Sequence, residues 1–104
     1  MSAASPWWLY LVRTRTGSLY TGIALDVQAR FAAHAAGAGA KALRGRGPLQ
    51  LVFSTRVGAR GAALRLEARV KRLPKAAKEL LPSAGLPKGW VRAARVATGS
   101  RRAQ

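Results

Sequence analysis

The feature that most constrains this chain is a pair of short apolar segments separated by a polar turn. Residues 7–13 and 19–23 are rich in aromatic and β-branched side chains, and the polar insert between them contains Gly17. This pattern predicts a β-hairpin, with Gly17 at a positive φ in the turn. Each predicted strand carries one tyrosine, Tyr10 or Tyr20. The rest of the fold must therefore be built against a sheet that starts near the N-terminus.

A helix is predicted directly after the hairpin. Asp26 is a suitable capping residue for its first turn. Val27 and Phe31 then form one apolar stripe, and Arg30 and His34 lie four residues apart on the neighbouring stripe. Phe31 is thus expected in the core, with Arg30 and His34 at its border.

Further elements follow from the same patterns. A third strand is expected at residues 49–54, after Gly47 and Pro48. A helix over residues 60–73 has its buried stripe at spacings of three and four, and a short helix follows at 75–81. The order β-β-α-β-α-α indicates an α+β fold, a small three-stranded antiparallel or mixed sheet with flanking helices. We expect residues 1–6 to be a disordered lead-in, 7–82 to form one domain, and 83–104 to form a basic, flexible tail.

The charge of the chain is strongly positive and narrows its function. Nineteen Lys and Arg residues stand against three acids, which gives a formal net charge of +16. A field of this size favours a polyanion, above all nucleic acid. Three scattered acids can hardly hold two catalytic metal ions or form a glycosidase pair. With one histidine and no cysteine, multi-histidine zinc sites, thiol nucleophiles and disulfide partners are excluded.

Hydropathy predicts no membrane segment. The longest uninterrupted apolar run is residues 7–12, far below the roughly 20 residues that a membrane helix needs. No basic segment followed by an apolar core precedes it, so no secretory signal is expected. We therefore expect a cytoplasmic protein without a membrane partner, as a monomer or weak dimer.

A glycine-rich basic loop is predicted between the first helix and the third strand. Residues 36–47 contain four glycines together with Lys41, Arg44 and Arg46. Such a segment can be a plain flexible connector. Given the net charge, we favour contact with the phosphates of nucleic acid, because glycine permits close approach and the cations supply charge.

Taken singly, the polar residues of the hairpin and helices have ordinary interpretations. A strand tyrosine usually packs with its hydroxyl at the surface. Arg30 and His34 could form a solvated helix face. Glu67 and Lys71 could be a surface pair that stabilises the helix by only about 0.3–0.5 kcal/mol.

Together, these residues resemble a known family. Trp8, Leu9 and Tyr10 on one strand, then Tyr20, Thr21 and Gly22 on the next, are followed by Arg30 and His34 on a helix and by Glu67 on a later one. This order is similar to that of the GIY-YIG nuclease domain, over roughly residues 7–80, and looks closest to its small stand-alone members. The first motif has Trp8 and Leu9 where the family has Gly-Ile, and the second has Thr21 where the family has Ile.

The resemblance implies roles for these residues. Tyr10, Tyr20, Arg30 and His34 would be catalytic, Glu67 would bind one Mg²⁺ or Mn²⁺ ion, and Gly22 would belong to the structural motif. Mg²⁺ keeps several waters and uses few protein ligands, so one carboxylate suffices. Tyr10 would activate water, which requires its pKa to fall from about 10. Lys71 would join the loop cations in contacting phosphates.

The sequence therefore predicts a metal-dependent endonuclease that hydrolyses DNA, with DNA favoured over RNA. It has no appended recognition module, so structure-selective or non-specific action in repair, recombination or processing is expected. The alternative is a non-catalytic nucleic-acid-binding module, for DNA or RNA, that retains the nuclease fold. A third interpretation is a basic protein that docks on an acidic protein, which salt-dependent nucleic-acid affinity would exclude.

Overall fold

A central strand organises the sheet. In the computed structural model, which describes residues 5–102 and side chains up to residue 96, β1 (Trp7–Arg13) is the middle strand of three. β2 (Leu19–Ala24) and β3 (Gln50–Gly58) both pair with it antiparallel. The sheet is thus fully antiparallel, one of the two arrangements that the sequence left open. The hairpin turn has Gly17 at φ 93°, as predicted.

β3 is longer than the strand expected at residues 49–54. It pairs along the whole of β1, from Gly58 opposite Trp7 to Gln50 opposite Arg13. The length of β3 is set by pairing with β1 rather than by its own apolar run. A prediction from the local apolar pattern therefore ended the strand too early.

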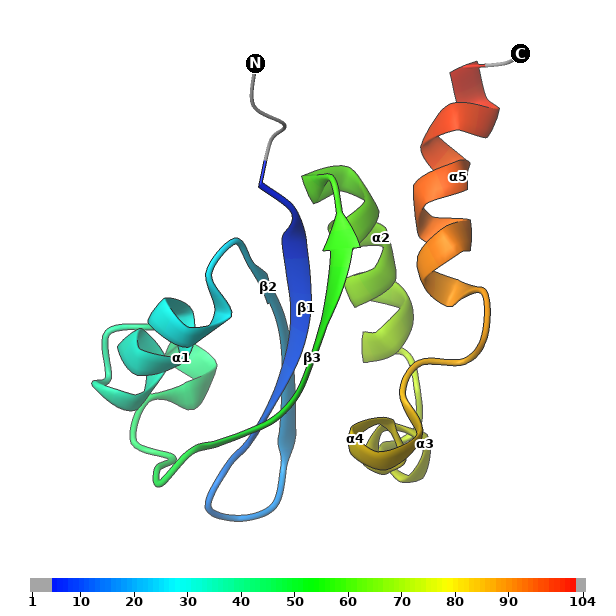
Figure 1. Cartoon of the computed structure of the whole chain (residues 1–104). Coiled ribbons are helices and arrows are strands. Elements are labelled where there is room, and N and C mark those ends of the chain that lie inside the picture. Colours follow the sequence, from blue (N-terminus) through cyan, green and yellow to red (C-terminus); the bar gives the residue numbers. More distant parts are fainter. Residues whose placement is uncertain (1–4, 103–104) are drawn as a thin grey trace.

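Alternate side chains of β1 enter two separate hydrophobic clusters. Leu9 and Leu11 join the cluster under α2 (Arg60–Lys71), whereas Tyr10 and Val12 join the one under α1 (Val27–Ala35). The sheet is therefore a middle layer. α1 and the short 3₁₀ helix η1 (Lys41–Leu43) lie on one face, and α2 with the later helices lies on the other (Figure 1).

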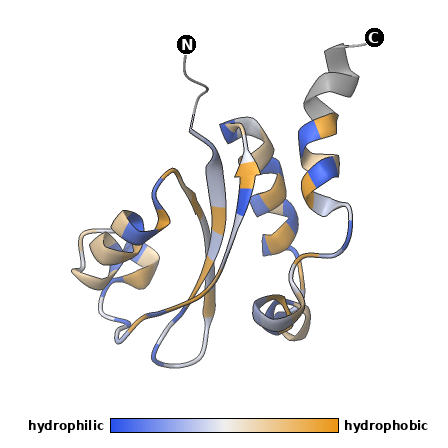
Figure 2. Ribbon diagram, in the orientation of Figure 1, coloured by the Kyte–Doolittle hydropathy of each residue, from blue (hydrophilic) through white to orange (hydrophobic). Residues whose placement is uncertain are grey.

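Both main helices begin where the sequence predicts, but α2 ends at Lys71 rather than at residue 73. Asp26 caps α1, because its side chain accepts a hydrogen bond of 3.0 Å from the backbone N–H of Ala29. On α2, Ala63, Leu66 and Val70 are buried against the sheet. Figure 2 shows hydrophobic and hydrophilic positions alternating along this helix, as expected for one covered face.

A flexible tail was expected at residues 83–104, but the described part of it, up to residue 102, differs, and residues 103–104 lie outside the described residues. After α3 (Lys75–Glu79) and α4 (Leu81–Ala84), a long helix, α5 (Trp90–Arg102), runs beside α2 (Figure 1). The Arg69 guanidinium lies 3.8 Å from the ring centroid of Trp90, and Ala94 is buried in the cluster under α2. These contacts with α2 stabilise α5. The Gly, Pro and Arg content of the segment had predicted no helix there.

The expected lead-in at residues 1–6 lies mostly outside the described residues. Within residues 5–102, no helix is long and apolar enough to cross a membrane.

An ion-pair cluster ties the hairpin to α3. Arg13 at the end of β1 makes two hydrogen bonds of 2.8 Å to the carboxylate of Glu79. Lys75 contacts the same carboxylate at 3.0 Å and donates to the backbone carbonyl of Gly17 in the turn at 2.8 Å. We call Arg13, Lys75 and Glu79 the hairpin clasp, because together they join the turn to the helices on the α2 side.

Candidate active site

Tyr10 lies at the centre of the predicted site and is buried. Its side chain is 1% exposed, and it faces α1 from the middle strand. Gly22 is its partner on β2. A Cβ atom at Gly22 would come within 2.4 Å of the Tyr10 hydroxyl oxygen, so only glycine lets this ring cross β2. The Tyr-x-Gly motif is thus explained by steric space: its glycine makes room for the tyrosine of the neighbouring strand.

His34 holds the Tyr10 hydroxyl. Its Nε2 lies 2.8 Å from the Tyr10 oxygen, and its Nδ1 accepts a hydrogen bond of 3.1 Å from the backbone N–H of Ala40. Because a backbone N–H can only donate, Nδ1 of the neutral ring carries no proton. The proton is therefore on Nε2 and is donated to Tyr10.

The burial of His34 was not predicted. We expected this residue at the border of the core, but its side chain is only 2% exposed. The glycine-rich loop folds back over it, and a Cβ at Gly39 would lie 2.0 Å from Nδ1. Gly39 and the N–H of Ala40 are thus parts of the site that the sequence analysis missed. The glycine spacing of this loop was the available signal.

Tyr20 completes an aromatic cluster with these two rings. Its ring centroid lies 6.4 Å from that of Tyr10 and 5.6 Å from that of His34, the latter in an edge-on arrangement. Tyr20 is half-buried. One ring of the cluster thus reaches the surface while the other two are held inside.

Burial and nearby charges act on the pKa of the Tyr10 hydroxyl, some raising it and some lowering it. Burial raises this pKa above 10.0, and Tyr20 and Glu67 raise it further, whereas Arg30 lowers it. Arg30 and Glu67 come from α1 and α2 on opposite faces of the sheet, yet both act on this one oxygen. The net direction is opposite to the lowering that the sequence analysis expected of a water-activating tyrosine.

His34 is kept neutral by the same surroundings. Burial lowers its pKa below 6.5, and the positive charge of Arg30 lowers it further. A neutral ring fits the hydrogen-bond pattern, in which one nitrogen accepts and the other donates.

Glu67 lies on α2 with its side chain 18% exposed, and its carboxylate is 3.3 Å from Lys71. The part of the chain that the structure describes contains no group of three potential ligands among its His, Asp and Glu side chains. A single carboxylate suits Mg²⁺, which fills its other positions with water and substrate phosphate. Glu67 therefore fits as the protein ligand of one hard divalent ion.

The loop cations lie at the surface on the α1 side. Lys41, Arg44 and Arg46 are exposed. The backbone of this loop is fixed to the hairpin by a hydrogen bond from Arg15 N–H to the carbonyl of Arg46 at 2.9 Å. Exposed cations on an anchored backbone are available to a polyanion.

Most of this chain is similar in sequence to a known family and to several known proteins. Residues 6–79 match the family model described as the GIY-YIG catalytic domain. The UPF0213 protein of Citrobacter koseri is 56% identical over 81 residues, which cover 78% of this chain and 81% of that protein. The UPF0213 protein YhbQ of Escherichia coli is 57% identical over 81 residues, with the same shares of 78% and 81%. A UPF0213 protein of Bacillus halodurans, solved by solution NMR, has 40% identity and a TM-score of 0.49, covering 81% of this chain and 90% of that one.

Proposed function

The chain belongs to the GIY-YIG catalytic domain family, a nuclease family whose substrates are nucleic acids, and from this premise we propose that it is a metal-dependent endonuclease that hydrolyses DNA phosphodiester bonds. The observation that carries the proposal is the convergence on one hydroxyl. His34 donates to the Tyr10 oxygen at 2.8 Å, and Arg30 and Glu67 both act on its pKa. Phosphodiester hydrolysis needs an oriented water, positive charge on the phosphoryl oxygens and stabilisation of the leaving oxygen.

The proposed role of Tyr10 is to orient the attacking water and take its proton. The hydrogen bond from His34 Nε2–H occupies one side of the Tyr10 oxygen and would stabilise a tyrosinate there. Tyr20, at the surface of the cluster, would hold the same water from the solvent side. His34 itself stays neutral and acts as the positioning residue for Tyr10.

The proposed role of Arg30 is to bind the phosphoryl group. It is exposed on α1, and its guanidinium offers a rigid fork of donors that matches two non-bridging oxygens. One Mg²⁺ or Mn²⁺ ion held by Glu67 would supply charge to the phosphoryl and leaving oxygens and would offset the effect of the carboxylate on Tyr10. Lys71, 3.3 Å from that carboxylate, would contact an adjacent phosphate.

The substrate proposal rests on charge. The exposed cations Lys41, Arg44 and Arg46 would contact the DNA backbone, which carries no sequence information by itself. We therefore propose structure-selective or non-specific cutting, in repair, recombination or processing of DNA in the cytoplasm, by a monomer or weak dimer.

Cleavage assays with matched variants test this proposal. Duplex, single-stranded, flapped and branched DNA, and RNA, are incubated with Mg²⁺, Mn²⁺ or EDTA. Tyr10→Phe keeps the buried ring and removes the hydroxyl, so cutting should fall by about 10²- to 10⁴-fold. Glu67→Gln should lose metal-dependent cutting. The control Glu79→Gln removes an acid of the hairpin clasp, away from the site, and should still cut. Cutting that survives in Glu67→Gln would contradict the metal site.

A second candidate function is favoured by one observation. The Tyr10 side chain is only 1% exposed, as expected of a tyrosine with a structural role, which suits a nucleic-acid-binding module, for DNA or RNA, that does not cut. Tight, salt-dependent binding with no cleavage of any substrate would support this alternative.

A further inference from the structure

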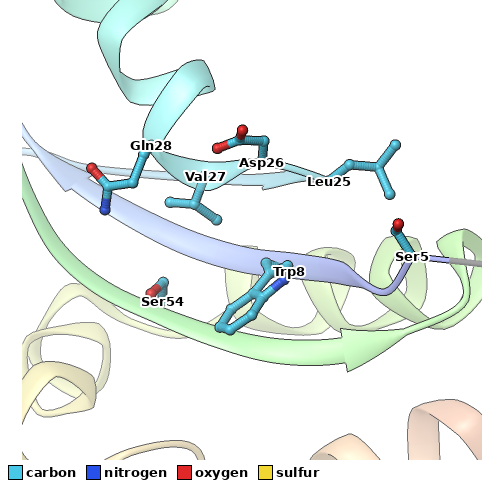
Figure 3. Close-up of a pocket in the computed structure, with 7 residues that line it drawn as sticks. All are labelled: Ser5, Trp8, Leu25, Asp26, Val27, Gln28 and Ser54. Carbon is cyan, nitrogen blue, oxygen red and sulfur yellow. The ribbon is translucent and has the colours of Figure 1, made fainter.

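A pocket of about 560 Å³ lies beside the start of α1 and takes no part in the site described above. Figure 3 shows the residues that line it, which lie on β1, on β3, around the start of α1 and just before β1. Trp8 is on β1, Ser54 is on β3, and Asp26 and Gln28 are at the start of α1. Trp8 is half-buried, whereas the three polar side chains are exposed. The pocket thus combines one large aromatic side chain with hydrogen-bonding groups at an open rim.

The charge of this pocket is unlike that of the rest of the molecule. Asp26 is one of three acids in a chain of formal net charge +16, and no Lys or Arg lines the pocket. A phosphate group would be repelled by this carboxylate and would find cations elsewhere on the surface. The uncharged part of a polyanion is the better occupant here.

The polar side chains of the pocket favour an uncharged ligand that has hydrogen-bond donors. One oxygen of Asp26 accepts from the N–H of Ala29, and the carboxylate has further lone pairs, which can only accept. A carboxylate accepts well from the exocyclic amino group of cytosine. The Gln28 amide and the Ser54 hydroxyl can donate or accept, and Trp8 offers an apolar aromatic surface for a flat ring.

The pocket is close to the proposed catalytic cluster. Trp8 and Tyr10 are two residues apart on one face of β1, which corresponds to about 7 Å. A second pocket, of about 500 Å³, shares Leu25 and Asp26 with the first and is lined further along by Arg30. A strand whose phosphate contacts Arg30 could therefore place a neighbouring base beside Trp8.

We propose that this pocket binds an unpaired nucleobase that carries an exocyclic amino group, next to the phosphate held at the candidate active site. This proposal rests on the proposed function, because that function supplies nucleic acid as the substrate. It deepens that function, because a base must be unpaired to present its hydrogen-bonding edge and flat face to the pocket. It also gives a physical basis for a preference for single-stranded or frayed DNA.

Binding in EDTA tests the pocket without cutting. The probes are labelled oligo-dC, oligo-dT and a fully paired duplex, each with the full chain. The unmodified protein should bind oligo-dC more tightly than oligo-dT, because thymine has no amino group. Asp26→Asn keeps a capping residue but replaces the acceptor-only carboxylate, so the preference for oligo-dC should fall roughly fivefold. Gln28→Ala, at an exposed position, should weaken both single strands.

The aromatic side chain has its own matched control. Trp8→Leu should weaken both oligonucleotides about tenfold and leave duplex affinity unchanged. Trp90→Leu removes another half-buried tryptophan, on α5 at the other side of the sheet, and should not change the ratio of single-strand to duplex affinity. Melting curves establish that each variant is folded.

The outcomes separate the two proposals. A preference for oligo-dC that depends on Asp26 supports the pocket even if no substrate is ever cut. An unchanged preference in Asp26→Asn, or equal losses for duplex and single strands in Trp8→Leu, would overturn the pocket and leave the nuclease proposal standing.

Discussion

At the scale of single residues, the candidate site depends on two positions without a side chain. Gly22 leaves space for the Tyr10 hydroxyl, and Gly39 leaves space for the His34 ring. The motif pattern predicted Gly22, because it lies within a hairpin whose register can be inferred from sequence. Gly39 could not be predicted in the same way. Its role depends on a loop folding back over α1, and helical periodicity contains no information about such a loop.

The buried His34 predicts a stability change near neutral pH. Its pKa in the folded state is lowered below 6.5, so below pH 6.5 the unfolded chain binds more protons than the folded one. The unfolding free energy should therefore fall as the pH drops from 6.5 towards the folded-state pKa, and level off below it. His34→Gln can still donate to Tyr10 but does not titrate, so it should lack this fall.

Urea unfolding between about pH 8 and pH 5 measures this change. His34 is the chain's single histidine, so no second imidazole contributes to the slope. Identical slopes in the two proteins would show that the ring is not held neutral.

Thr21, between Tyr20 and Gly22, carries a buried hydroxyl group whose hydrogen bonding predicts a stability change. Among the side chains that the structure describes, its Oγ1 is buried without a hydrogen bond. Replacing it in Thr21→Val removes an unsatisfied polar atom and keeps the shape. The free energy of unfolding should rise by about 1 kcal/mol.

A second buried threonine is the matched control for this prediction. The Thr14 hydroxyl lies 3.3 Å from that of Thr16, so Thr14→Val loses a hydrogen bond and should lower the unfolding free energy by about 1 kcal/mol. Denaturant titrations measure both changes. Destabilisation of equal size in both variants would mean that the Thr21 hydroxyl has a partner after all.

At the scale of elements, the sequence predicted those whose signals are local. The hairpin, α1 with its Asp26 cap, and α2 with its buried stripe follow from periodicity and capping. The full length of β3 and the existence of α5 (Trp90–Arg102) depend on partners distant in sequence. α5 is stabilised where Trp90 stacks on Arg69 and Ala94 packs under α2, which composition alone does not reveal.

The hairpin clasp predicts a second stability change, at acid pH. Arg13 and, to a lesser degree, Lys75 lower the pKa of Glu79 from 4.5 to about 2. The folded-state carboxylate thus stays charged where the unfolded one takes up a proton. The stability from the clasp is complete above 4.5 and is lost as the pH falls through about 2.

Glu79→Gln should therefore flatten the acid side of the stability curve, measured by urea unfolding between about pH 5 and pH 2. Lys75→Met keeps the paired hydrogen bonds from Arg13 and should retain most of the slope. A full slope in Glu79→Gln would exclude the clasp as its source.

At the scale of the whole molecule, the three acids have separate places among the cations. Asp26 caps α1, Glu79 holds the clasp, and Glu67 lies near Tyr10. Sequence composition predicted a polyanion as the partner, but it could not indicate which cations are already engaged within the protein. Cations on the α2 side, such as Arg13, Arg69 and Arg95, are engaged in contacts within the protein.

The salt dependence of affinity tests which face makes the proposed contacts with DNA. Each phosphate contact contributes about −0.9 to the slope of log K against log salt concentration on duplex DNA. If the α1-side loop contacts phosphates, the variant with Lys41, Arg44 and Arg46 all changed to Gln should reduce the magnitude of the slope by roughly 3. The control changes two exposed cations at the start of α5 to Gln, Lys88 just before the helix and Arg92 in its first turn. Its slope should stay close to that of the unmodified protein, because a general loss of net charge acts far more weakly than lost contacts. Equal reductions per charge in the two variants would mean that the DNA has no preferred face, and a larger reduction in the control would place it against α5 instead.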